Sequence, residues 1–246
     1  LLFSLGFLAI YFVVRWYIRR EKIKLQKEQE IFNKISSFEL KSLRAQMNPH
    51  FIFNCLNSIK DYLYKKDFES TAKYLSKFAS LVRKSLNMSR SNYASIDEEI
   101  AFLDTYCLLE QMRFSMQFDY VITNINLPED YELPTLMIQP FVENAIRHGQ
   151  IGNLPYKGTL RIQFELQGEE LCCIIEDNGI GYEQGLKNKK SKINEEESKS
   201  LNIFEERISL YKMVYHLNIE MQILDKTIRE EKGTLVTIVL KPSDKA

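Results

Sequence analysis

Hydrophobic positions follow two different patterns along the chain, with the change near residue 117. Before it, apolar residues recur at steps of three and four, which is typical of amphipathic helices. Residues 15–47 contain no Gly or Pro and are rich in Lys, Glu and Gln. They predict one continuous helix, which either pairs with a partner chain as a coiled coil or stands as a single solvated helix.

A helix is also expected around and after Pro49, with a polar stripe opposite an apolar face. The polar stripe holds His50, Asn54, Asn57 and Asp61, and the apolar face holds Ile52, Leu56, Ile59 and Leu63. Because proline lacks a backbone donor, a kink is expected at Pro49. His50 should face water while the helix packs through its apolar face, which suits a neutral imidazole that acts as a nucleophile.

A second helix is expected over residues 68–90, and a third should follow it. The apolar seam of the second helix consists of Phe68, Ala72, Leu75, Ala79, Val82 and Leu86. A junction at residues 65–67 predicts an antiparallel hairpin, and two such hairpins make a four-helix bundle. Ser95 and Glu98 have the spacing of a capping box, which predicts a helix from there through Phe114.

Beyond residue 117, short runs rich in Ile, Val, Leu, Phe and Thr predict strands. The strands are expected at residues 118–125, 159–167, 170–176, 217–224 and 234–241, with helices at 136–148 and 200–215. Residues 183–199, dominated by Lys, Asn, Glu and Ser, predict a mobile loop. The mixture predicts an α+β sandwich with helices on one face of a mostly antiparallel sheet.

Composition argues against two classes of function, nucleic-acid binding and zinc binding. The chain has 246 residues and a formal net charge of zero, so no basic field favours nucleic acid as a partner. None of its four cysteines forms a Cys-x-x-Cys pair, and no Cys/His spacing suits zinc. Cys172 and Cys173 lie in an apolar run and are expected in the core.

The N-terminal segment has the pattern of a membrane anchor. Residues 1–14 are apolar and uncharged, and five basic residues follow within residues 15–24. An apolar run before a cationic cluster predicts the cytoplasmic end of a transmembrane helix. Since a bilayer needs about 20 residues, we expect the chain to be part of a longer protein whose sensor region precedes it. A signal peptide has the opposite charge order, and a surface anchor needs a polar face.

Three segments of the second half carry candidate chemistry. In residues 139–149, Glu143, Asn144, Arg147 and His148 are expected on the polar side of a helix. A carboxylate beside a carboxamide can hold hydrated magnesium, and a guanidinium can meet phosphate. A solvated charged helix face is the alternative for this helix taken alone.

The second segment is residues 176–181, which follow a strand. Asp177 at the strand end can accept a hydrogen bond from an exocyclic amine, as on adenine, and Gly179 and Gly181 let backbone approach a ligand. By itself, Asp-Asn-Gly is also a common turn. The third segment is Gly233-Thr234 at the start of the last strand, a feature that many hairpins share.

Residues 49–54, Pro-His-Phe-Ile-Phe-Asn, closely resemble the phosphoacceptor box of the LytS/YehU-type sensor histidine kinases. Residues 103–114 resemble the connector of that type. In order and spacing, the three segments of the second half resemble the N box, the first glycine box and the final Gly-Thr of the histidine-kinase-like ATPase fold. The resemblance extends over about residues 38–241 and rests on several separate motifs that agree in order.

The resemblance implies a role for each matched residue. Catalytic roles fall to His50 as the phosphorylated residue, Glu143, and Asn54, which would orient the imidazole or a hydrolytic water. Magnesium would be held by Asn144 and Glu143. The ATP site would comprise Asn144, Arg147, His148, Asp177, Gly179, Gly181, Ser200 and Thr234, with Asp177 reading adenine and Thr234 lining the adenine end.

Two departures from the family pattern bear on activity. Many histidine kinases carry an acid after the phosphorylated histidine, whereas Phe51 stands here, so the general base is unassigned. The ATP lid of typical members is glycine-rich, but residues 198–207 contain no glycine. Ser200, Lys199 or Asn202 is expected to substitute for the missing backbone amides, and slow ATP turnover is a possible consequence.

The resemblance implies a four-part organisation. Residues 1–18 end a transmembrane helix, 19–37 form a coiled-coil linker, 38–116 form the dimerisation and phosphotransfer helices, and 117–246 bind ATP. Such a protein is a homodimer in the bacterial cytoplasmic membrane that passes its phosphoryl group to a response regulator. Two alternatives stay open: a nucleotide-binding scaffold with weak catalysis, and an ATPase clamp that does not phosphorylate itself.

Overall fold

The computed structural model describes residues 11–27, 30, 49–128, 131–182, 184, 218–229 and 231–241. The chain divides into two compact units, residues 1–46 and 47–246. In the first unit, residues 11–27 are helical and exposed, with the Arg20 guanidinium 5.2 Å from the centre of the Trp16 ring. No helix in the described part is long and apolar enough to cross a bilayer. Residues 1–10, 28–29 and 31–48 lie outside that part, so the expected anchor (1–18) and coiled-coil linker (19–37) are described only in part.

The second unit begins with a helical hairpin, as predicted. Helix α2 spans Pro49–Tyr64 and α3 spans Phe68–Met88. Lys66 turns the chain with a φ of 58°, and Asp67 caps α3 by accepting the Ser70 N–H at 3.0 Å. The rings of Tyr62 and Tyr74 meet across the hairpin at 5.9 Å. The kink expected at Pro49 depends on preceding residues that lie outside the described part.

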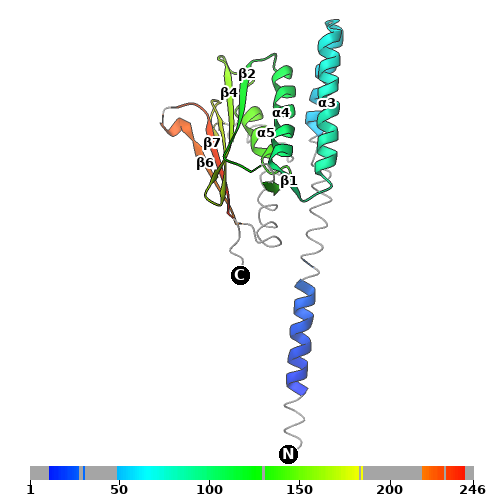
Figure 1. Ribbon diagram of the computed structural model, residues 1–246, viewed down its shortest axis with the longest axis vertical. Coiled ribbons are helices and arrows are strands. Elements are labelled where there is room, and N and C mark those ends of the chain that lie inside the picture. Colours follow the sequence, from blue (N-terminus) through cyan, green and yellow to red (C-terminus); the bar gives the residue numbers. More distant parts are fainter. Residues whose placement is uncertain are drawn as a thin grey trace, which may run out of the picture. The chain divides into compact units, whose positions relative to one another are not determined.

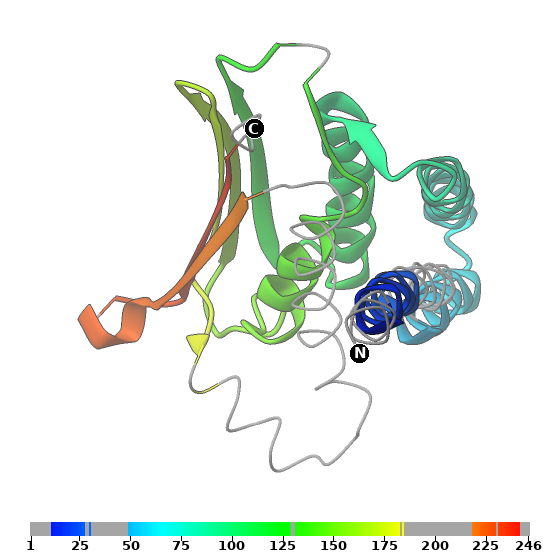
Figure 2. The same ribbon diagram turned by 90° about the horizontal axis from the view of Figure 1, so that it is seen from below.

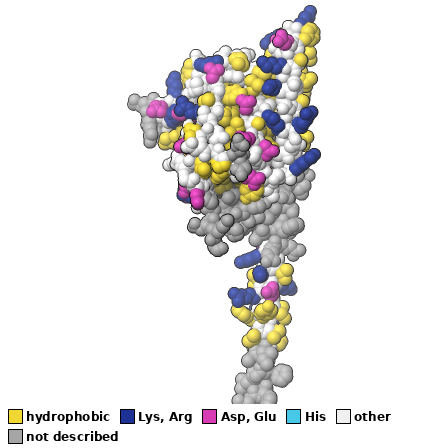
Figure 3. Space-filling model, viewed as in Figure 1, with side chains coloured by type: hydrophobic (Ala, Val, Ile, Leu, Met, Phe, Trp, Pro, Cys, Tyr) yellow, Lys and Arg dark blue, Asp and Glu magenta, His cyan; other side chains and the backbone are white. Residues whose placement is uncertain are grey.

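The predicted packing faces of the hairpin helices are only partly buried within the single chain, where Ile59 packs against the core. Helix α2 buries Phe51, Cys55 and Ser58, and α3 buries Tyr74, Leu81, Ser85 and Met88. The expected seams stay open to solvent: Leu56 is 50% exposed, Leu75 50% and Leu86 58%. The reason is that α4 covers a different face of the hairpin. Figure 3 shows apolar side chains among Lys and Arg along the α3 edge.

Helix α4, Ile96–Arg113, begins with the predicted capping box. The Glu98 N–H donates to Ser95 Oγ at 3.2 Å, and the Ser95 N–H donates to Glu98 Oε2 at 3.1 Å. The helix is buried on two sides, because it lies between the hairpin and the sheet (Figures 1 and 2). Its buried apolar residues include Phe102, Leu103, Tyr106, Cys107 and Leu109.

The five predicted strands form one twisted sheet of order β2-β4-β5-β7-β6. They span Phe118–Ile125 (β2), Gly158–Gln167 (β4), Glu170–Asp177 (β5), Asn218–Asp225 (β6) and Thr234–Lys241 (β7). Strands β2 and β4 pair in parallel and the other neighbours are antiparallel, so the mostly antiparallel mixed sheet is confirmed. Helices α4 and α5 cover one face (Figure 2).

The remaining elements are short. Helix α5 covers Gln139–Arg147, within the predicted 136–148 range, and the 3-10 turn η1 covers Lys226–Arg229. Strands β1 (Tyr93–Ser95) and β3 (Glu132–Pro134) pair antiparallel and were not predicted, because three residues are too few to show a period. The expected helix at 200–215 and, except for Gln184, the loop at 183–199 lie outside the described residues.

All four cysteines are free and buried, which confirms the prediction made for Cys172 and Cys173. Burial raises the pKa of each thiol, and that of Cys55 reaches about 11. The thiols therefore behave as small apolar groups of the core.

Candidate functional site

Three segments far apart in the sequence meet at the end of α5. The Ile180 N–H donates to the Gly149 carbonyl oxygen at 3.0 Å. A Cβ on Gly179 would stand 2.2 Å from that same oxygen, and one on Gly233 would stand 1.9 Å from the Asp177 carbonyl oxygen. Only glycine fits such contacts, and Gly233 also has a φ of 99°. The N-box, glycine-box and Gly-Thr segments therefore form one site.

Asp177 lies at the centre of this convergence. It is 4% exposed, and its Oδ1 accepts the Gly179 N–H at 2.8 Å. Burial raises the pKa of this carboxyl to about 6, against the opposing effect of hydrogen bonds from the Gly179 and Thr234 backbones. Thr234, at the start of the last strand, is itself 8% exposed, and its backbone is one of the donors to Asp177. A buried carboxylate with remaining acceptor capacity can select an amine.

Gly181 joins the site to a second buried acid that the sequence did not single out. Gly181 has a φ of 88°, and a Cβ there would stand 2.8 Å from Asp225 Oδ1. Asp225 Oδ1 also accepts the Thr227 N–H at 2.9 Å. Next to it, Lys226 Nζ lies 2.7 Å from Glu176 Oε1. In the sequence, Asp225 is recognisable only as an acid at the end of a strand, and this feature is too common in surface turns to mark a site.

Helix α5 divides into the two faces that its sequence predicted. Glu143, Asn144, Arg147 and His148 are half-buried, whereas Phe141, Val142, Ala145 and Ile146 are buried in the core. Arg147 Nη1 lies 2.8 Å from Glu143 Oε1, with the side chains 22% and 16% exposed. The cation expected to meet phosphate is thus already paired within its own helix.

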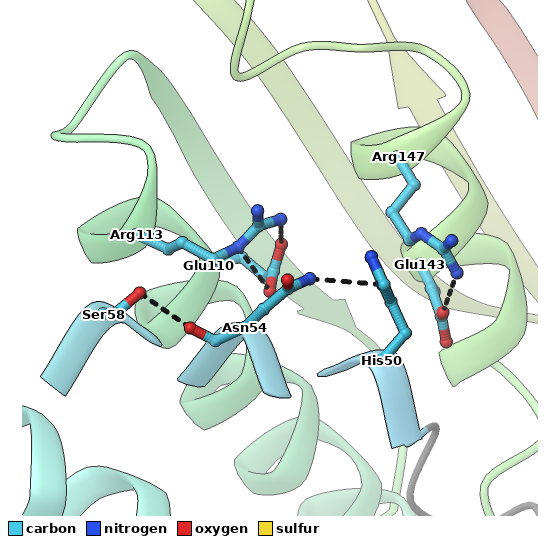
Figure 4. A network of polar contacts seen from close by, with 7 residues as sticks. All are labelled: His50, Asn54, Ser58, Glu110, Arg113, Glu143 and Arg147. Carbon is cyan, nitrogen blue, oxygen red and sulfur yellow. Dashed lines mark hydrogen bonds and ion pairs between the residues drawn. The ribbon is translucent and has the colours of Figure 1, made fainter. Parts of the chain in front are cut away.

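His50 lies in the first turn of α2 with its side chain exposed. Its Nδ1 is 3.2 Å from Asn54 Nδ2, and Ser58 Oγ donates to the Asn54 carbonyl oxygen at 3.0 Å. In Figure 4 the imidazole lies between Asn54 and the Glu143–Arg147 pair of α5. If the Asn54 amide presents its oxygen instead, that oxygen accepts a hydrogen bond from Nδ1–H and leaves the Nε2 lone pair for chemistry.

Tyr106 of α4 links the surroundings of His50 on α2 to those of Glu143 on α5. Its ring lies 5.0 Å from that of Phe51, the residue after His50. Burial raises the pKa of Tyr106, and the negative charge of Glu143 adds to the effect. Helix α4 therefore touches both the helix that bears His50 and the face of α5 that bears Glu143.

Two expected site components are not tested by this geometry. Ser200 lies outside the described residues, as does the whole of the expected lid. Within the described part, no three His, Cys, Asp or Glu side chains gather as a metal site. Asn144 and Glu143 supply two neighbouring oxygen donors, which fits an ion that takes its other ligands from phosphate and water.

Comparison with known proteins places these observations in a family context. Residues 38–118 match the family model described as histidine kinase. The sensor histidine kinase BtsS of Escherichia coli strain K12 is 34% identical over 152 residues, which is 61% of this chain and 26% of that protein. The sensor protein LytS of Streptococcus agalactiae serotype V is 30% identical over 168 residues, 68% of this chain and 28% of that protein. These matches confirm the resemblance to LytS/YehU-type sensor histidine kinases.

The chain spans about a quarter of the length of these LytS-type relatives. The family model covers the hairpin and α4 and ends at Phe118, where the sheet begins. A solved histidine kinase domain from Erythrobacter litoralis aligns with 87% of this chain and 94% of its own, at 11% identity and a TM-score of 0.43. The nucleotide site therefore rests on its own geometry.

Proposed function

We propose that this chain is the kinase part of a sensor histidine kinase. It would bind ATP where α5, β5 and β7 meet, transfer the γ-phosphoryl group to His50, and pass it on to an aspartate of a response regulator. The observation that carries the proposal is the convergence of Gly149, Gly179 and Gly233 around the buried Asp177. Similarity to BtsS and LytS supports the same activity.

The chemistry of each side chain fits its role in ATP binding. Asp177 accepts a hydrogen bond from the adenine amine, and Thr234, Gly179 and Gly181 shape the adenine end. Asn144 and Glu143 would hold magnesium, which would neutralise the charge of the phosphates when bound. His148 borders the phosphates at the end of α5, and Ser200 takes the place of a lid glycine.

Phosphoryl transfer begins with attack by an imidazole nitrogen of His50 on the γ-phosphorus. The P–O bond to the β-phosphate breaks, ADP leaves, and the imidazole proton passes to a base. Asn54 orients the ring. The Glu143–Arg147 pair faces His50, and a phosphate that engages Arg147 would release the Glu143 carboxylate. The freed carboxylate would then be available to magnesium, and the base that takes the imidazole proton is not assigned. Positioning supplies most of the catalysis, as in other phosphoryl transfers.

The exposed seams of the hairpin suit a second copy of the chain. Leu56, Leu75 and Leu86 lie on faces that the single chain leaves open, and two hairpins would join them in a four-helix bundle. In the full assembly, residues 1–18 would end a transmembrane helix and 19–37 would form the coiled-coil linker. Residues 38–116 would dimerise and carry His50, and 117–246 would bind ATP on the cytoplasmic side.

Autophosphorylation with γ-labelled ATP and magnesium tests the proposal. Wild type should gain an acid-labile, base-stable label, which His50→Gln and Asn144→Asp should both lose. His216→Gln is the matched control and should keep the label. Wild type that binds ATP but gains no label would contradict the kinase assignment and leave the nucleotide-binding scaffold. Label retained in His50→Gln would contradict the assigned phosphorylation site.

A further inference from the structure

Glu99 of α4 holds the backbone that leads into α5. Its carboxylate is completely buried. Oε2 accepts the Leu136 N–H at 3.0 Å, and Oε1 accepts the Ile138 N–H at 3.2 Å. Both oxygens of one acid thus bind two amides in the three residues before Gln139, where α5 starts. A buried charge is kept in a protein only where such partners compensate its lost hydration.

The segment that Glu99 holds has a conformation that it would not adopt readily by itself. Leu136 has a φ of 54°, in the left-handed region that side chains other than glycine avoid. The N-cap residue of α5 is Ile138, which offers no side-chain cap. From another helix, Glu99 supplies acceptors for the backbone N–H groups of Leu136 and of the N-cap residue Ile138.

The same helix is also tied to the hairpin that bears His50. Lys84 of α3 donates to the Ala101 carbonyl at 2.7 Å and to Thr105 Oγ1 at 2.9 Å. The Tyr62 hydroxyl of α2 donates to the Met112 carbonyl at 3.1 Å. These contacts hold α4 against the hairpin, while Glu99 holds α5 against α4.

We propose that Glu99 is a positioning residue for phosphoryl transfer. By fixing the start of α5 to α4, it sets where Glu143 and Asn144 stand relative to His50. This inference rests on the proposed kinase function. The adenine contacts lie at the opposite end of α5, near Gly149 and Asp177. Loss of the Glu99 contacts should therefore slow transfer more than it weakens nucleotide binding.

The test compares Glu99→Gln with Glu98→Gln in the full dimeric protein. A glutamine at 99 keeps one acceptor oxygen and turns an NH₂ group toward the second backbone N–H, whereas a glutamine at 98 can still complete the capping box. At saturating ATP, Glu99→Gln should label His50 at least about tenfold more slowly, because small displacements cost that much in transfer. Its KM for ATP and its Kd for ADP should stay within about threefold of wild type. Glu98→Gln should match wild type in all three quantities.

Hydrogen exchange of peptides over residues 134–142 gives a readout that does not depend on activity. Exchange there should speed up in Glu99→Gln and stay unchanged in Glu98→Gln. If wild type fails to label, the kinase function fails, and exchange still decides whether Glu99 holds α5. Unaltered exchange, an unaltered rate, or a loss confined to ATP affinity would overturn the positioning role. Should Glu99→Gln not fold, Glu99→Asp, one methylene shorter, replaces it; unfolding of both would make Glu99 a folding residue only.

Discussion

The Ile180 N–H donates to the Gly149 carbonyl oxygen at 3.0 Å, which joins the end of α5 to the loop after β5. This contact leaves no room for a side chain at Gly179, whose Cβ would stand 2.2 Å from that oxygen. The two segments that carry the expected phosphate and adenine contacts are thus fixed to each other through backbone. The geometry of the nucleotide site therefore depends on close backbone approach.

We expect Gly179→Ala to separate these segments and lower ATP affinity at least about tenfold, since the clash is with backbone that cannot turn away. Titration calorimetry with ADP, which makes the same adenine contacts as ATP, measures the loss of affinity. Gly168→Ala is the control: Gly168 also has a positive φ, of 66°, but a Cβ there meets nothing within 4 Å. It should lose about 1–2 kcal/mol of stability while ADP binding stays unchanged. Equal affinity in Gly179→Ala and wild type would contradict the close-approach argument.

Asp177 should make both stability and ATP binding depend on pH. Its folded pKa of about 6 lies above the ordinary value of 3.8. Between these values the folded protein keeps a proton that the unfolded chain has released, so the free energy of unfolding falls as pH rises, by about 3 kcal/mol at most. Denaturant titration from pH 4 to 7 should show the fall in wild type and a smaller one in Asp177→Asn.

The effect on nucleotide affinity has the opposite direction. Protonation below about pH 6 removes an acceptor for the adenine amine, so ATP affinity should fall as pH is lowered through this value. ITP presents a carbonyl in place of the amine but carries the same phosphates, so it serves as the control for their titration and should lose less affinity than ATP in this range. Identical pH profiles for the two nucleotides would rule out adenine reading by Asp177.

Lys84 should stabilise the packing of α3 against α4. Its ammonium group makes two hydrogen bonds to α4, and burial lowers its pKa. Lys84→Met keeps the aliphatic stem and should lower the free energy of unfolding by about 1–2 kcal/mol through the lost hydrogen bonds. Lys73→Met on the exposed side of α3 should change it by less than about 0.5 kcal/mol. Urea unfolding of both variants gives the comparison.

Substitution of the open hairpin seams should weaken dimerisation without disturbing the nucleotide site. Leu56→Glu with Leu75→Glu places charges where the proposed bundle would bury leucines, each 50% exposed in the single chain. Light scattering after size-exclusion chromatography should show a monomer that still binds ADP. Lys73→Glu, exposed and outside the seam, should stay dimeric. A dimer that persists in the double variant would place the interface elsewhere.

Local sequence patterns were sufficient to predict an element of secondary structure where the interactions that form it are between neighbours along the chain. The Ser95–Glu98 capping box lies within one turn, so the start of α4 could be predicted and is observed. The five long strands could be predicted because alternation and β-branched residues extend over eight or more positions. Asp177, Gly179 and Gly233 could also be selected from the sequence, because an acid at the end of a predicted strand and nearby glycines are visible in the local pattern.

The burial of the hairpin faces could not be predicted in the same way. Helix α2 has one apolar stripe through Leu56 and another through Phe51 and Cys55, and periodicity alone does not say which one meets the same chain. The stripe through Phe51 and Cys55 is buried because α4, which is distant in sequence, packs against it and places Tyr106 against Phe51.

By itself, the sequence determined the described elements of this protein, the His50 box and the residues proposed for the nucleotide site, because each pattern depends on neighbours along the chain. Only the tertiary structure decided that Gly149 and Gly233 both meet Asp177, and that Glu99 holds the start of α5. These contacts join residues separated by up to 56 positions, from Asp177 to Gly233, and their energies arise only when packing brings the elements together.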